Sequence, residues 1–150
     1  MVARWFLMSM LGVVLAPWAL ADTGPRDPGQ YFFNDTFGNF QEELETARDE
    51  GKKGILLMFE MDECPFCHYM KRRILNQPAV QDHFRAHSLI FPVDIEGDIE
   101  ITDFSGNTTT MKDFALQQYR VRATPVFAFF DTDGNYIKRA RLTGKANNQG

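Results

Sequence analysis

The chain has 150 residues, which is enough for one domain with a hydrophobic core and too few for two. Its net charge is −4 and its lysines and arginines are dispersed along the sequence, so we expect no nucleic-acid partner. Apolar residues make up 44% of the chain, and its fourteen Phe predict a core rich in aromatic rings.

Residues 1–21 have the layout of a secretory signal peptide. Arg4 supplies the positive charge, an apolar stretch follows it, Pro17 breaks that stretch, and Ala19-Leu20-Ala21 matches a cleavage site. The alternative is an uncleaved membrane anchor, because nothing after Arg4 in this segment is charged. The proline and the small residues favour cleavage, so we predict an exported, periplasmic protein.

The rest of the chain divides into a lead-in, one domain and a tail. Residues 22–29 are rich in Pro, Gly and charge and are predicted to be a flexible lead-in, residues 30–144 form the domain, and residues 145–150 form a polar tail. Within the domain, apolar residues at helical spacing, capping residues and helix breakers predict helices at 40–47, from Cys67 to about Leu75, and at 110–119. Pro78 is predicted to break or kink the second of these, and a further helical piece runs to about His87. Apolar runs predict strands at 55–60, 89–95, 126–130 and 136–142, with an inserted short hairpin or loop at 98–110.

This order of elements indicates the fold class. Parallel strands joined by helices, followed by a hairpin, give an α/β sandwich with a central mixed sheet flanked by helices.

The segment Cys64-Pro65-Phe66-Cys67 carries the chemistry. These are the only two cysteines of the chain, so within it they can pair only with each other. A strand that delivers two thiols to the first turn of a helix is typical of dithiol–disulfide chemistry. The helix N-terminus favours the thiolate of Cys64, which is the attacking form.

Three other interpretations of the cysteines compete with this one. They could be structural, but Pro65 and the acidic pair before Cys64 indicate a surface turn. Cys64 to His68 also matches the Cys-x-x-Cys-His signature of c-type haem attachment, although the motif follows a β-strand rather than lying in a helical haem pocket. With His83 and His87 the cysteines match zinc-finger spacing, but a whole helix with a proline lies between the two pairs, and we expect no metal.

A second feature supports the redox interpretation. Thr124 and Pro125 stand at the start of the apolar strand 126–130, a position that tolerates proline. If their peptide bond is cis, the Thr124 backbone is exposed beside the thiols, where it can pair with an extended substrate.

With both features in place, residues 30–144 resemble the thioredoxin superfamily. The segments Met58-Phe59-Glu60, Asn76-Gln-Pro-Ala-Val and Pro92-Val-Asp-Ile-Glu-Gly97 are similar to exported SoxW-type thioredoxins of bacterial sulfur-oxidation clusters. The resemblance implies that Cys64 attacks, that Cys67 resolves, and that Pro125 is the cis-proline. It also implies that Pro65, Phe66, Thr124 and Pro125 contact the substrate.

The chain departs from the usual thioredoxin pattern at three places. Met58 stands where thioredoxins carry a buried Asp, and Glu63 stands where they carry a Trp. The dipeptide between the cysteines is Pro-Phe rather than Gly-Pro. The chain stops six residues after Gly144, so we expect the usual C-terminal helix to be absent.

We therefore predict a periplasmic protein disulfide oxidoreductase, a reductase that works through Cys64 and Cys67 without a cofactor. The resemblance implies a membrane electron carrier of the CcdA/DsbD type as its partner, besides protein disulfide substrates. The alternatives are a dithiol oxidase, a non-catalytic thioredoxin-fold binding module and a haem carrier. Alternation along the strand places Glu60 on the same side as Met58, so Glu60 is either a shifted proton relay for Cys67 or a solvated strand-end residue.

Overall fold

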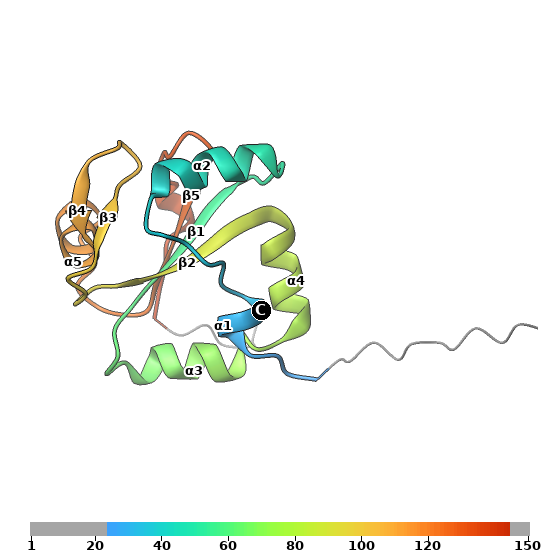
Figure 1. The fold of residues 1–150 in the computed structure, drawn as a ribbon. Coiled ribbons are helices and arrows are strands. Elements are labelled where there is room, and N and C mark those ends of the chain that lie inside the picture. The colour runs from blue at the N-terminus through green and yellow to red at the C-terminus, as the bar shows by residue number, and fades with distance from the viewer. Residues whose placement is uncertain (1–23, 145–150) are drawn as a thin grey trace, which may run out of the picture.

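The computed structural model describes residues 24–144, so the predicted signal peptide and polar tail lie outside the described residues. Its centre is a four-stranded sheet of order β2-β1-β5-β6, made of β1 (Gly54–Glu60), β2 (Ser88–Asp94), β5 (Val126–Asp131) and β6 (Leu142–Thr143). β2 runs parallel to β1, whereas β5 runs antiparallel to it. The predicted mixed α/β sandwich is confirmed (Figure 1).

Helices cover both faces of this sheet. Figure 1 shows α2 (Phe40–Asp49) above the sheet and α3 (Pro65–Arg73) below it, with α1 (Pro28–Tyr31) and α4 (Pro78–His87) near α3. β1 contributes side chains to the cores on both faces of the sheet, because successive side chains of a strand point to opposite faces. Leu57 and Phe59 belong to the core under α2, whereas Leu56 and Met58 belong to the core that holds the two cysteines.

Local signals explain where the helices near the cysteines begin and end. Pro65 and Pro78 each occupy the first turn of a helix, where a missing N–H costs nothing. The break predicted at Pro78 is thus confirmed, because α3 and α4 are separate helices. Asn76, between them, donates its side-chain N–H to the carbonyl of Arg72 at 2.7 Å and so caps the end of α3.

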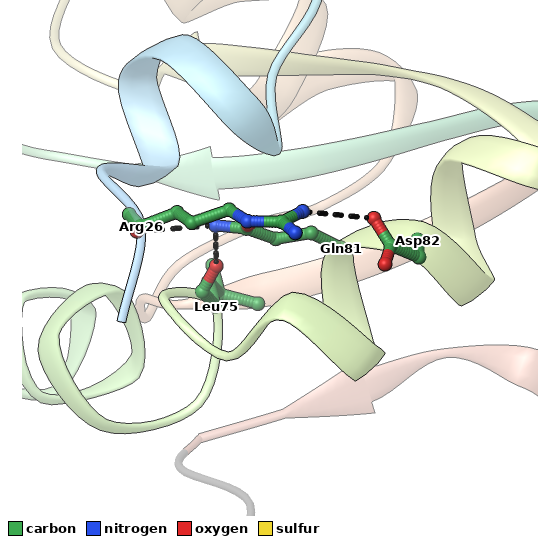
Figure 2. A network of polar contacts seen from close by, with 4 residues as sticks. All are labelled: Arg26, Leu75, Gln81 and Asp82. Atoms are coloured by element: carbon green, nitrogen blue, oxygen red, sulfur yellow. Dashed lines mark hydrogen bonds and ion pairs between the residues drawn. The ribbon is translucent and has the colours of Figure 1, made fainter. Parts of the chain in front are cut away.

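The segment before α2 differs from the predicted flexible lead-in. Asp27 caps the short helix α1, and the Arg26 N–H donates to the carbonyl of Asn76 at 2.8 Å. Gln81, only 1% exposed, donates to the carbonyls of Arg26 at 3.1 Å and Leu75 at 2.8 Å (Figure 2). Residues 24–29 are therefore fastened to the junction of α3 and α4.

The predicted insertion at 98–110 is a hairpin of β3 (Glu100–Thr102) and β4 (Thr108–Thr110). Its turn is held by Asp103, which is buried and accepts hydrogen bonds from the backbone of Ser105 and Asn107 and from the side chain of Gln118. Burial raises the pKa of Asp103, but these hydrogen bonds outweigh it and hold the pKa below its usual value. The ring of Phe104 packs 4.6 Å from that of Phe130, so the hairpin is anchored on the core.

The helix predicted at 110–119 is present with an altered pitch. Thr110 caps α5 (Met111–Asp113), which continues as the π-helix η1 (Phe114–Gln118). The Val121 N–H reaches back to the carbonyl of Ala115 at 3.0 Å and closes the widened turn.

The strand predicted at 136–142 is wrong over most of its length. Tyr136 faces Phe130, but Leu142 faces Phe127, so three of the residues between them have no partner in β5. They form the 3₁₀ turn η2 (Lys138–Ala140), and only β6 pairs beyond it. None of the helices in residues 24–144 is long and apolar enough to span a lipid bilayer.

Candidate active site

The two cysteines lie where β1 passes into α3. Cys64 is the N-cap of α3, and its Sγ accepts a hydrogen bond from the backbone N–H of Cys67 at 3.0 Å. The sulfurs are joined in a disulfide with an S–S distance of 2.08 Å and a Cα–Cα distance of 5.2 Å. The first helical turn thus brings together the pair that the sequence predicted, with one sulfur at the positive end of the helix dipole.

The loop around the disulfide is exposed although the sulfur-bearing residues are not. Cys64 is 2% exposed and Cys67 is 1% exposed, a greater burial than the predicted surface turn implies. Pro65 and Phe66 between them are exposed, Phe66 by 51%. Phe66 therefore exposes an apolar ring two residues after the buried Cys64.

Thr124 and Pro125 stand directly before β5, and their peptide bond is cis. Phe127, two residues further on, packs in the same hydrophobic cluster as Cys64 and Cys67, which brings the start of β5 to the disulfide. Thr124 Oγ1 is buried and has no hydrogen-bond partner within the described part of the chain. An unsatisfied buried hydroxyl of this kind costs about 1–3 kcal/mol.

Glu60 ends β1 on the face of the sheet that carries the cysteines. Its side chain is 17% exposed, and its Oε2 lies 2.6 Å from Nζ of Lys71 in α3. Glu60 is thus a half-buried, ion-paired carboxylate and not a solvated strand-end residue. Both side chains line an open groove of about 1250 Å³ beside α1, together with Phe33 and His68.

Sequence reasoning missed Lys71, although a signal for it was available. Lys71 follows Cys67 by four residues, and side chains at this spacing share one face of a helix. Its ammonium also lies 5.7 Å from the centre of the Phe33 ring, a cation–π contact that joins the segment directly after α1 to α3. The position of α1 could not be read from the sequence, so neither could this contact.

His68 and His87, from the haem and zinc interpretations, each make a hydrogen bond to a backbone carbonyl. His68 Nε2 lies 3.0 Å from the carbonyl oxygen of Asp62, beside the disulfide. His83 and His87 are both on α4, with Nδ1 of His87 2.7 Å from the carbonyl of His83. Across residues 24–144, no three His, Cys, Asp or Glu side chains are arranged to hold a metal ion.

The fold and this site together define a thioredoxin-fold protein with a Cys-x-x-Cys disulfide at a helix N-terminus. Residues 40–149 match the family of thioredoxin-like domains, which is most of the sequence. The chain therefore belongs to the thioredoxin-like domain family. A comparison with curated proteins finds none that matches.

Solved structures share the fold at low sequence identity. A thioredoxin-fold protein from Helicobacter pylori has 24% identity and a TM-score of 0.52, covering 64% of this chain and 62% of its own. The C-terminal domain of DsbD from Neisseria meningitidis, in the oxidised form, has 23% identity and a TM-score of 0.53, covering 77% of this chain and 89% of its own. A disulphide-isomerase homologue from Bacteroides thetaiotaomicron, described as putative, has 20% identity and a TM-score of 0.56, covering 77% and 85%. The chain thus spans less than two thirds of the Helicobacter protein, and these likenesses establish the fold alone.

Proposed function

We propose that this protein is a periplasmic thiol–disulfide oxidoreductase that reduces protein disulfides through Cys64 and Cys67. The observation that carries the proposal is the Cys64–Cys67 disulfide at the first turn of α3, packed in one cluster with the strand that follows Thr124 and Pro125. Export is supported by the signal-like residues 1–21. In an oxidising compartment, a reductant needs a continuing supply of electrons.

The reaction begins from the dithiol form. The Cys64 thiolate attacks one sulfur of the substrate disulfide, that disulfide breaks, and the departing sulfur leaves as a thiolate that takes up a proton. Cys67 then loses its proton and attacks Cys64. The mixed disulfide breaks, the second substrate sulfur leaves reduced, and the Cys64–Cys67 disulfide forms, so two electrons pass from the pair to the substrate.

The Cys64–Cys67 disulfide is then reduced again by thiol–disulfide exchange with a donor dithiol, which becomes oxidised. We propose a membrane electron carrier of the CcdA/DsbD type as that donor, in line with the SoxW-type resemblance. The fold likeness to the DsbD C-terminal domain is compatible with this assignment. Direction is supported by Asp62 and Glu63, which are exposed directly before Cys64. Their negative charges oppose the helix dipole, and a Cys64 thiolate that is not strongly stabilised favours a reductant.

Substrate contact is assigned to four residues around the disulfide. Phe66 supplies an exposed apolar surface, with Pro65 beside it. The Thr124 backbone, next to the cis peptide bond of Pro125, supplies pairing groups for an extended segment.

Glu60 is proposed as the group that takes the Cys67 proton during the second attack. It is held on the cysteine face of β1 by Lys71, which follows Cys67 by one helical turn. A carboxylate in this position can accept the proton directly or through one water.

Trapping of mixed disulfides tests the proposed function. A Cys67→Ser variant, reduced and then mixed with a disulfide-bonded reporter protein, should accumulate a covalent adduct through Cys64, whereas Cys64→Ser should accumulate none. The wild-type protein should reduce the reporter without adduct. Equal trapping by both variants would contradict the assigned roles, and the absence of any thiol exchange would contradict the function.

A further inference from the structure

Charge is distributed unevenly along the second half of the chain. Residues 94–103 contain five acidic residues and no basic one. Residues 119–130 and 136–144 together contain five basic residues and no acidic one. An acidic stretch therefore begins at the end of β2, and basic residues both precede and follow β5.

The sheet order places these stretches on opposite sides of β1, the strand that leads to the disulfide. β2 and β5 are the two neighbours of β1, and β1 leads to Cys64. The Ile95 N–H donates to the carbonyl of Glu60 at 2.9 Å, so the acidic stretch begins beside the end of β1. β5 runs antiparallel to β1, and Val126 faces Phe59, so the basic residues that precede Pro125 lie at the same edge of the sheet.

The charges at this edge are exposed and are not neutralised locally. Glu96 and Asp98 are exposed after β2, on one side of β1, and Arg120 and Arg122 are exposed before β5, on the other. None of these four side chains takes part in the ion pairs found within residues 24–144.

Other charges near the same edge do not cancel this asymmetry. Asp62 and Glu63, exposed directly before Cys64, follow β1 itself and add negative charge in the connection that leads to the disulfide. Lys112 of α5 lies at the acidic loop, because its backbone N–H donates to the carbonyl of Gly97 at 3.0 Å, and it offsets part of the charge of Glu96 and Asp98. The remaining exposed charge is acidic on the β2 side of β1 and basic on the β5 side, so it creates a directed field over this end of the sheet.

Apolar side chains are exposed at the same edge. Ile99 is 66% exposed within the acidic stretch, and Phe66 is 51% exposed beside the disulfide. The Met111 N–H donates to the carbonyl of Ile99 at 2.9 Å, which fixes the acidic loop against the start of α5. Exposed apolar side chains between unpaired charges are typical of a surface that a partner covers.

We propose that this edge is an electrostatically polarised docking surface for a polypeptide whose disulfide-bonded cysteine has basic residues on one side and acidic residues on the other. Its basic residues face Glu96 and Asp98, and its acidic residues face Arg120 and Arg122. This inference rests on the proposed function and names the class of substrate that the site takes. Complementary charge of this kind raises the association rate and fixes the direction in which the chain lies.

Peptides with opposite charge order provide the test. Two pentapeptides, Lys-Lys-Cys-Glu-Glu and Glu-Glu-Cys-Lys-Lys, have the same composition, and each is capped at its cysteine as a disulfide with mercaptoethanol. The reduced protein should react with one order about tenfold faster than with the other at low salt. The difference should shrink as ionic strength rises, because the screening length falls from roughly 30 Å at 0.01 M to roughly 8 Å at 0.15 M.

Charge reversal ties any preference to the named residues. A variant with Glu96→Lys, Asp98→Lys, Arg120→Glu and Arg122→Glu should prefer the opposite peptide order. The double variant with only Glu96→Lys and Asp98→Lys should reduce the preference for the wild-type peptide order. This variant provides the test if the fourfold variant does not fold. A control with Glu45→Lys and Asp49→Lys, both exposed on α2 over the other face of the sheet, should keep the wild-type preference.

Each outcome separates the inference from the function on which it rests. Equal rates for the two peptides, or a preference that survives charge reversal, would overturn the docking surface while leaving the reductase intact. A protein that reacts with neither peptide nor the reporter protein would overturn the proposed function itself.

Discussion

Glu60 and Lys71 form an ion pair with an Oε2–Nζ distance of 2.6 Å, on the same face of the sheet as the Cys64–Cys67 disulfide. Glu60 ends the strand that leads to the cysteines, and Lys71 lies one turn after Cys67 in the helix that carries them. The pair therefore bridges the two elements that position the disulfide. It also keeps a carboxylate near the site although Met58 occupies the position of the buried thioredoxin Asp.

Replacing Glu60 with Gln should slow the resolving step about tenfold or more, because general-base assistance is typically worth at least that factor. The measurement is the rate at which Cys67 releases a product from a preformed mixed disulfide on Cys64, followed over pH. The pH profile should change shape, an effect that loss of an ion pair alone would not produce. Glu50→Gln, which breaks the Lys52–Glu50 pair at 3.6 Å, is the matched control and should leave rate and profile unchanged. A Glu60→Gln protein with the wild-type profile would reduce Glu60 to a structural role.

Replacing Phe66 with Ala should weaken reduction of protein disulfides more than reaction with a small thiol. The Phe66 ring is half exposed, two residues after the buried Cys64. We expect a protein substrate to contact this ring, whereas the reaction with the small reagent dithiothreitol should not need that contact. We expect the KM for a protein disulfide to rise several-fold, in keeping with the loss of roughly 1–2 kcal/mol of apolar contact. Steady-state kinetics with both reagents make the comparison. An equal loss of rate with the protein disulfide and with dithiothreitol would mean that Phe66 affects the reactivity of the disulfide and not substrate binding.

Replacing Gln81 with Leu should destabilise the fold by about 1–3 kcal/mol, because the carbonyls of Arg26 and Leu75 lose their buried donor. Asp82→Asn is the matched control, since it removes only the exposed ion pair between Asp82 and Arg26, which we expect to contribute less than about 1 kcal/mol. Denaturant unfolding of both variants gives the two values. Equal losses would show that the N-terminal segment is held by its charges and not by the buried amide.

Replacing Asp103 with Asn should destabilise the protein at neutral pH and have little effect in acid. Its pKa is lowered on folding from the ordinary value of 3.8, so the carboxylate contributes stability above that value. That contribution is lost as pH falls through the folded-state pKa, because the unfolded chain then binds the proton more readily. The stability difference between wild type and variant, measured by unfolding at pH 7 and below pH 3.8, should therefore shrink in acid.

Asp131 offers the control for this prediction. It holds the turn before Asn135 with the same pattern of hydrogen bonds, and these also lower its pKa, but it is less buried than Asp103. Asp131→Asn should also lower the free energy of unfolding at neutral pH, but by less than Asp103→Asn does. A loss at Asp103 that persists unchanged in acid would mean that packing, and not charge, holds the hairpin turn.

The sequence predicted the parts of the structure that rest on local signals. The apolar run before Cys64, the caps at Asn39 and Thr110, and the break at Pro78 all act within a few residues, and each appears where it was expected. The cis bond at Pro125 was also expected, because the resemblance to the thioredoxin superfamily implies it.

The parts that depend on distant contacts could not be predicted in the same way. The segment around Arg26 is ordered by Gln81, 55 residues later in the chain. The strand predicted to begin at Tyr136 is interrupted because its register against β5 shifts by three residues, which only the pairing itself reveals. Glu60 was placed on the correct face by alternation, but its partner Lys71 lies on a different element.

The central claim is that the Cys64–Cys67 pair acts as a reductant, and its reduction potential tests this most directly. The measurement is equilibration of the purified protein with dithiothreitol or glutathione buffers, followed by thiol quantification. The acidic residues before Cys64 and the SoxW-type resemblance predict a potential near that of thioredoxin, roughly −270 mV. A potential near that of DsbA, roughly −120 mV, would contradict the account and make the protein an oxidase.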